Sequence, residues 1–335
     1  MKVSNSPLPV ILTGVALTVL LIAPQLGIDT ARAQERAYPA KAVRFVTSLA
    51  AGSGADGFAR SVAELLTRRL NQSVIVEPRP GAGGNLAAET VAKAAPDGYT
   101  LLMSSVASNA INATYYRTLN YDLRRDFAPI SKFGQIANGL IVGAGVSANN
   151  LTEFTALIKA APDRHSCASS GTGGMLHLTC EMYKKAAGLE ILHVPYKGSA
   201  SILPDLMAGR ITMLFDNIPV YVPLAKAGKV KILVVTTLTR SPVLPEVPTA
   251  AESGLPGMES RGLFGLLAPA GTPTEVVRLL NREVGAVLND ATLREKLLQQ
   301  GIEPEASSPE ALRDLIQTEI AKWARVIKEA DIRPE

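Results

Sequence analysis

A glycine-rich segment near the start of the chain has the spacing of a nucleotide-binding loop. Residues Gly52–Gly57 read GSGADG, which fits the pattern G-x-G-x-x-G. The apolar run Val43–Val46 precedes the segment, and Glu77 follows about 20 residues later, where dinucleotide sites carry the acid that binds a ribose hydroxyl group. Taken alone, this segment predicts a dinucleotide-binding enzyme.

Two further glycine-rich turns favour a smaller ligand. Pro80–Asn85 (PGAGGN) and Ser169–Gly174 (SSGTGG) each follow a β-rich run and lead into a helical pattern. The amino terminus of a helix carries unpaired N–H groups and a partial positive charge, so it attracts anions. Loops of this kind, far apart in the sequence, fit two lobes that close on one small anion. A carboxylate suits such loops as well as a phosphate does.

The first 33 residues have the pattern of a secretory signal peptide. Lys2 precedes the apolar run Val10–Ala23, Pro24 ends that run, and Ala31–Ala33 (ARA) supplies the small residues of a cleavage site after Ala33. The apolar run is shorter than the roughly 20 residues that a membrane-spanning helix needs. We therefore expect an exported protein that is soluble after cleavage, and an exported enzyme would rarely meet NAD.

Composition excludes other classes of protein. The chain has 335 residues, of which 47% are hydrophobic and 19% are charged, with a formal net charge of +4. This apolar content is sufficient for two cores. The basic residues are scattered and do not cluster with aromatic residues, so we expect no nucleic-acid partner.

The chain alternates short β-rich runs with amphipathic runs, which is typical of parallel sheets covered by helices. The predicted strands are Val43–Ser48, Ser73–Glu77, Thr100–Ser104, His165–Ser169, Ile191–Val194, Ile211–Phe215, Lys231–Thr236 and Leu263–Leu267. The predicted helices are Phe58–Leu70, Gly84–Ala94, Leu151–Ala160, Met175–Ala187, Ala200–Ala208, Pro273–Asn289, Ala291–Gln300 and Pro309–Ala330. Gly188 is expected to end one helix, and Thr272 and Ser308 are expected to cap two others. The prediction is an α/β fold.

The two cysteines leave alternatives open. His165, Cys167, His177 and Cys180 lie within one predicted strand–helix unit, but their spacing matches no common zinc site. A disulfide bond between Cys167 and Cys180 is the other possibility, because an exported protein reaches an oxidising compartment. The pattern G-x-S-x-G is absent from the sequence, so no nucleophile elbow of a hydrolase is predicted.

Several longer motifs resemble a known family. They are YPAKAVRFV (38–46), RPGAGGNLAAETVAKAAPDGYTLL (79–102), FAPIS (127–131), HVPYKGSA (193–200), LFDN (214–217), RSPVLPEVPTAAESGLPG (240–257) and FGLLAPAGTP (264–273). Together they resemble the Bug family of periplasmic solute-binding proteins, which serve tripartite tricarboxylate transporters. The resemblance runs from about Tyr38 to the end of the chain.

The resemblance implies a type II periplasmic-binding-protein fold, in which crossover strands join two α/β lobes and the ligand lies in the cleft between them. The first lobe would contain residues 38–138 and 262–335, and the second lobe residues 139–261. The crossings would lie near Phe127–Ile141 and Thr237–Phe264.

The resemblance also implies a binding site without metal, cofactor or catalytic residues. Gly52 and Asp56 match the family's first loop, whereas Ala51 and Ser53 replace its proline and a glycine. His177 and Asp56 have structural alternatives, a hydrogen bond within the fold and a helix cap. The predicted ligand-binding residues are Ala50, Gly52, Ser53, Gly54, Asp56, Ser105, Ser169, Ser170, Gly171, Thr172, His177 and Asp216.

The function implied by the resemblance is that of a monomeric receptor, not an enzyme. It would capture a small carboxylate (a dicarboxylate, an aromatic acid or an acidic amino acid) for the membrane subunits of a tripartite tricarboxylate transporter. Two alternatives remain at this point. One is an exported α/β hydrolase that acts on a small acid, and the other is a partner that carries ligand to a membrane sensor.

Overall fold

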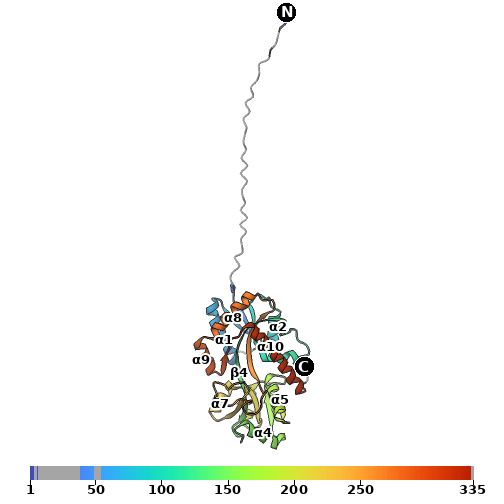
Figure 1. Ribbon diagram of the computed structural model, residues 1–335, viewed down its shortest axis with the longest axis vertical. Coiled ribbons are helices and arrows are strands. Elements are labelled where there is room, and N and C mark those ends of the chain that lie inside the picture. The colour runs from blue at the N-terminus through green and yellow to red at the C-terminus, as the bar shows by residue number, and fades with distance from the viewer. Residues whose placement is uncertain (4–5, 7–37, 49–53, 333–335) are drawn as a thin grey trace. The chain divides into compact units, whose positions relative to one another are not determined.

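The computed structural model describes residues 1–3, 6, 38–48 and 54–332. Most of the predicted signal peptide, including its cleavage site, lies outside the described residues, as do Ala50, Gly52 and Ser53. Within the described ranges, no helix is both long enough and apolar enough to cross a bilayer. The described residues 38–48 and 54–332 form two groups of elements around strand β4 (Figure 1).

The first group, here called the first lobe, combines elements from both ends of the chain. Its parallel strands β1 and β3 lie side by side, and the helices α1, α2, α8 and α10 surround them (Figure 1). The elements are β1 (Val43–Thr47), α1 (Gly54–Leu70), β2 (Val74–Pro78), η1 (Ala82–Gly84), α2 (Asn85–Ala92), β3 (Thr100–Ser105), α3 (Val106–Tyr115), β9 (Arg261–Pro269), α8 (Thr274–Leu288), α9 (Ala291–Gln299), β10 (Ile302–Pro304) and α10 (Pro309–Glu329).

The second group, here called the second lobe, comes from the middle of the chain. Its strands β5 and β7 are parallel, and α4, α5 and α7 lie around them (Figure 1). The elements are α4 (Leu151–Ala160), η2 (Pro162–Arg164), β5 (Ser166–Ser169), α5 (Met175–Ala187), β6 (Leu192–Pro195), η3 (Ser199–Ser201), α6 (Leu203–Met207), β7 (Met213–Asn217), η4 (Ile218–Val220), α7 (Val222–Lys226) and β8 (Val230–Val235).

Strand β4 (Phe127–Gly143) joins the two lobes. Residues 127–137 pair antiparallel with β9, whereas residues 138–142 pair antiparallel with β7. In the described part of the chain the sheet order is therefore β2-β1-β3-β9-β4-β7-β5-β6, and β8 and β10 also pair with β4. The change of partner falls between Ala137 and Asn138, so one continuous strand belongs to both sheets.

Each lobe buries apolar side chains on both faces of its sheet. In the first lobe, one cluster packs α1 and α8 against Phe45 and Phe133, and the other packs α3 and α10 against Leu263. Trp323 of α10 is fully buried, and its Nε1 donates a hydrogen bond to Oε2 of Glu319 at 2.8 Å. In the second lobe, α4 and α5 cover one face of the sheet and α6 covers the other.

Most of the predicted elements are confirmed: Leu151–Ala160 and Met175–Ala187 match at both ends, and the ends of the other confirmed elements differ by at most four residues. The prediction of one helix over Ala200–Ala208 is wrong, because the chain forms the 3-10 turn η3 and then α6, which has Pro204 in its first turn. Helix α3 was not predicted. Ser308 caps α10 by accepting a hydrogen bond from Ala311 N, whereas Thr272 instead donates one to Pro269 O.

Candidate functional site

The strand ends of both lobes that carry predicted site residues face the junction between the lobes. Asn217, the last residue of β7, pairs with Asn138 of β4, where β4 changes partner. Strand β5 runs parallel to β7, so its last residue, Ser169, lies at the same edge. In the first lobe, Ser105 at the end of β3 pairs with Phe264 near the start of β9. The carboxyl ends of β3, β5 and β7 therefore lie at the junction, which is where ligands bind in such sheets.

The loop after β5 contains both buried and exposed polar groups. Ser169 is 0% exposed, and its hydroxyl group donates a hydrogen bond to Gly171 O at 2.9 Å. Oγ of Ser169 also lies 2.7 Å from Nε2 of His193, on β6. Ser170 and Thr172, by contrast, are exposed. The hydroxyl group of Ser169 therefore shapes the loop, while those of Ser170 and Thr172 are open to a ligand.

His177, in the first turn of α5, is hydrogen-bonded to the same loop. Its side chain is buried, and Nδ1 accepts a hydrogen bond from Gly173 N at 3.1 Å. Nε2 therefore carries the proton of the neutral ring, and it faces Oε1 of Glu181 at 3.6 Å. The two imidazole rings of His177 and His193 stack with centroids 3.8 Å apart. This arrangement supports the structural alternative for His177.

His193 was not among the predicted site residues. Burial, and then the neighbouring His177, lower the pKa of His193 from 6.5 to about 4. The ring is therefore neutral at pH 7, and its Nε2 can donate to Ser169 while that hydroxyl group donates to Gly171. The only sequence signal for this residue was its place in the motif HVPYKGSA, because His193 meets Ser169 through strand pairing.

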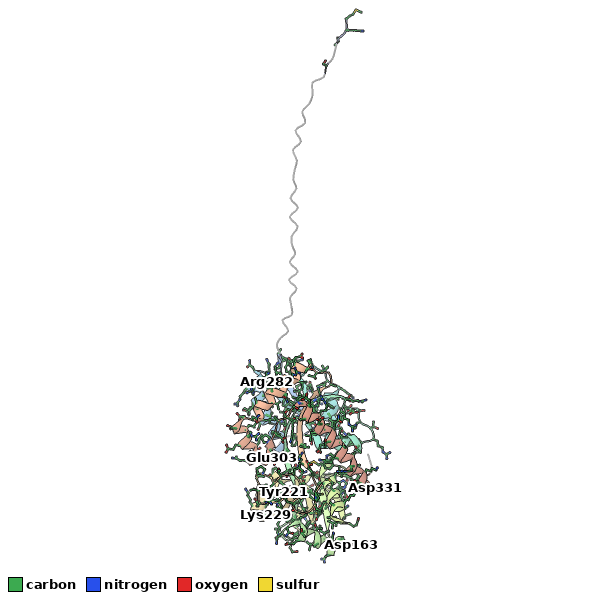
Figure 2. All side chains as sticks on the ribbon, in the orientation of Figure 1. Asp163, Tyr221, Lys229, Arg282, Glu303 and Asp331 are labelled. Atoms are coloured by element: carbon green, nitrogen blue, oxygen red, sulfur yellow. A yellow bond between two sulfur atoms is a disulfide. The ribbon has the colours of Figure 1, made fainter. Side chains whose placement is uncertain are left out.

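Asp216 is also a buried anchor of loops in the second lobe. It is 3% exposed, and its carboxylate accepts hydrogen bonds from Asn217 N at 2.7 Å and from the hydroxyl group of Tyr221 at 2.9 Å. Tyr221 is labelled in Figure 2. Burial raises the pKa of this carboxyl, and the side chain of Ser199 in η3 opposes that rise. Asp216 thus ties the end of β7 to η3 and η4.

The first lobe contributes Asp56 and Ser105. Helix α1 begins at Gly54, so Asp56 lies in its first turn instead of at the cap position. The Asp56 carboxylate is buried and accepts a hydrogen bond from Nε of Arg60 at 2.9 Å. Ser105 is partly exposed and directs its hydroxyl group to Oγ of Ser108 at 3.0 Å. An acid at the start of a helix stabilises it through the helix dipole.

The described site residues thus divide into two groups by burial. Asp56, Ser169, His177 and Asp216 are buried and bonded within the protein, so they position loops. The residues that a ligand can reach are Ser105, Ser170, Gly171 and Thr172. Helix α5 begins at Met175, immediately after this loop, and its N-cap residue, Gly174, provides no side-chain bond to the helix. Hydroxyl groups and amides at a helix amino terminus are suited to orienting an anion.

The structure resolves the alternatives for the cysteines. Cys167 and Cys180 form a disulfide bond, with a Cα–Cα distance of 6.6 Å. His165 immediately precedes β5, at the end of the strand away from Ser169, and its Nδ1 is 3.3 Å from the hydroxyl oxygen of Thr212. The four residues are therefore not assembled as a zinc site. Across the described ranges, no group of three His, Cys, Asp or Glu residues is placed to hold a metal ion.

Comparisons with known proteins place this site in a family. Residues 58–332 match the family described as tripartite tricarboxylate transporter family receptor (TctC). The chain belongs to this family. Protein BugT of Bordetella pertussis is similar, with 31% identity over 317 residues that cover 94% of this chain and 95% of BugT. The expected resemblance to Bug proteins is thereby confirmed.

Solved structures of similar proteins confirm the fold. An R. palustris protein solved with adipate is 37% identical, with a TM-score of 0.79, and the match covers 89% of this chain and all of the other. MatC from Rhodopseudomonas palustris, with bound malate, is 31% identical, with a TM-score of 0.75 over 87% of this chain and all of MatC. The family fold is the two-lobed α/β fold of periplasmic binding proteins, as predicted.

Proposed function

We propose that this protein is a periplasmic receptor that captures a small carboxylate and delivers it to the membrane subunits of a tripartite tricarboxylate transporter. The loop from Ser170 to Thr172 carries this proposal. It offers exposed hydroxyl and amide groups at the amino terminus of α5, and Gly173, the next residue, lies against Tyr115 of the first lobe. The two family structures that contain adipate and malate support a carboxylate as the ligand.

The binding residues form an inner set and a supporting set in this proposal. Ser105, Ser170, Gly171 and Thr172 contact the ligand, together with Ala50, Gly52, Ser53 and Gly54 from the loop between β1 and α1. Asp56, Ser169, His177 and Asp216 hold these loops in place through the hydrogen bonds described above. Part of the contact to the ligand would pass through ordered water molecules.

The proposal also includes the location of the receptor and the bounds of its lobes. Residues 1–33 direct export and are removed after Ala33, and the mature protein is a monomer. The first lobe comprises residues 38–138 and 262–335, and the second lobe residues 139–261. The lobes move about the crossover strands when the ligand binds.

A hydrolase is the second class of function to consider, because Ser169 and His193 lie within hydrogen-bond distance. A serine nucleophile must be exposed to its substrate and must give its proton to the histidine. Ser169 is fully buried and donates its proton to Gly171 O. These contacts favour a structural Ser–His pair, so we propose that the protein binds its ligand without chemistry.

The proposal is tested by titrating residues 34–335 with adipate, malate, benzoate and glutamate in a calorimeter, with thermal unfolding measured in parallel. A ligand at 100 times its Kd should stabilise the folded state by about 2.7 kcal/mol. Binding of at least one carboxylate, and no binding of the matching amide, is the expected result. If no carboxylate binds while a chromogenic ester is hydrolysed, the receptor proposal is wrong.

A further inference from the structure

Two neighbouring tyrosines at the end of α3 lie between glycine-rich loops of opposite lobes. The rings of Tyr115 and Tyr116 pack edge to face, with centroids 5.4 Å apart and an angle of 87° between their planes. Tyr115 is 4% exposed, and it belongs to an apolar cluster of the first lobe that also includes Leu178 of α5. This cluster therefore extends from the first lobe to the helix that begins after the second lobe's binding loop.

The phenol end of Tyr115 lies directly on Gly173. A Cβ atom added to Gly173 would lie 2.1 Å from Cζ of Tyr115, and 2.5 and 2.6 Å from its two Cε atoms. The backbone of Gly173 also has φ of 74°, a conformation that costs energy for any residue with a side chain. Glycine is thus required for two independent reasons, and the close approach of Tyr115 is one of them.

Tyr116 and Asn112 hold the corresponding loop of the first lobe. A Cβ atom on Gly83 would lie 3.5 Å from the hydroxyl oxygen of Tyr116, so the phenol end of this ring also faces a glycine. Nδ2 of Asn112 donates a hydrogen bond to Gly83 O at 2.9 Å. The end of α3 is therefore in contact with the glycine-rich loops of both lobes.

We propose that Tyr115 is a positioning residue for solute binding, which acts by setting where the loop Ser170–Gly174 stands relative to the first lobe. This inference rests on the proposed function, because it assumes that the loop binds the solute. Within the second lobe, His177 is hydrogen-bonded to Gly173. The ring of Tyr115, in the first lobe, limits how closely Gly173 can approach that lobe. The ring thereby fixes the separation of the two halves of the site.

A pair of substitutions tests the contact directly. Gly173→Ala adds a methyl group where Tyr115 stands, so the loop must move away from the first lobe. Tyr115→Leu remains apolar but lacks the Cε and Cζ atoms that would meet the new methyl group. The double variant therefore relieves the clash and leaves only the backbone strain. Gly188→Ala is the matched control, because Gly188 also has a positive φ, at the other end of α5, and a Cβ atom there would meet no atom within 4 Å.

Two measurements keep this inference separate from the proposed function. Affinity for adipate and malate should fall at least about tenfold in Gly173→Ala, recover partly in the double variant, and change less than about twofold in Gly188→Ala. Amide hydrogen exchange of residues 170–176, measured without ligand, should be faster in Gly173→Ala and in Tyr115→Leu than in the wild type and in Gly188→Ala.

The exchange measurement tests the contact between Tyr115 and the loop, and the affinity measurement tests its effect on solute binding. Unchanged exchange of residues 170–176 in both Gly173→Ala and Tyr115→Leu would overturn the positioning role, whether or not a carboxylate binds. Equal losses of affinity in Gly173→Ala and in the double variant would also overturn it. Faster exchange together with no binding of any carboxylate to the wild type would leave the contact between Tyr115 and the loop established and would reject the proposed function.

Discussion

Nε2 of His193 lies 2.7 Å from Oγ of Ser169, and this contact joins β6 to the turn that follows β5. Both groups make a further contact: Ser169 donates to Gly171 O in the loop, and the His193 ring stacks on His177 of α5. The loop that faces the first lobe is therefore supported by a chain of polar contacts. Substitutions can change the stability of the loop separately from its ligand binding, because buried residues stabilise the loop and exposed residues are available to the ligand.

The neutral state of His193 makes stability depend on pH. Its pKa is lowered to about 4 in the folded protein, whereas an unfolded histidine has a pKa near 6.5. Between these values the unfolded chain binds more protons, so stability falls as the pH falls from about 6.5 to 4. We expect a loss of about 1–2 kcal/mol over this range, below the full linkage value because the ring is only partly buried.

Urea unfolding from pH 7 to 4 measures this loss. His193→Gln is the control, because its amide can still donate to Ser169 but does not titrate. The variant should lose less stability over the same range than the wild type does. Identical pH profiles for the two proteins would contradict the assigned pKa shift.

Asp216 provides a second test of the supporting network. Asp216→Ala leaves the buried hydroxyl group of Tyr221 without the acceptor that it has in the native protein, which should cost about 2–4 kcal/mol. Asp216→Asn retains one acceptor oxygen and is neutral in a site where burial already raises the pKa of the carboxyl, so its cost should be smaller. Chemical unfolding of both variants measures the difference. Equal stabilities of the Ala and Asn variants would contradict the role of Asp216 as an acceptor.

The disulfide bond predicts a response to reducing agents. Cys167 and Cys180 close a short loop with a sequence separation of 13, and the chain-entropy model assigns about 3 kcal/mol to a loop of this size. Both residues are fully buried, so the native protein should resist mild reduction, whereas unfolding in dithiothreitol should occur at lower urea concentration than without it. Cys167→Ala/Cys180→Ala is the control, and its unfolding should not respond to dithiothreitol. Two reactive thiols in the unreduced, denatured wild type would show that the bond is absent.

The sequence predicted most of the sheet because local patterns determine it. Alternating strands and helices such as Val43–Thr47 and Met175–Ala187 have clear periodicity and end signals, and the family motifs predicted the crossing near Phe127–Ile141. Strand β4 extends over that crossing, and its change of partner at Asn138 depends on pairing with strands far along the chain.

The roles of the site residues were harder to predict, because the sequence does not show which side chains are buried. Ser169 and Ser170 are adjacent and chemically identical, yet one is enclosed and the other is exposed. His193 lies 24 residues after Ser169 and reaches it only through the pairing of β5 with β6. Tyr115 was missed for a further reason, since helix α3 has neither a glycine nor a proline to mark its ends.

Ser169 and Ser170 should therefore respond differently to substitution. Ser169→Ala removes the acceptor for His193 and the donor for Gly171 O, so stability should fall by about 1–3 kcal/mol. Ser170→Trp places a large side chain on the exposed side of the loop, so stability should change by less than about 0.5 kcal/mol while carboxylate binding is lost. Urea unfolding and calorimetric titration with adipate and malate of each variant measure the two effects. Thr152→Trp, at an exposed position of α4, is the control for a surface tryptophan and should bind as the wild type does. Retained binding in a stable Ser170→Trp variant would exclude this loop from the site, and a fully stable Ser169→Ala variant would remove Ser169 from the supporting network.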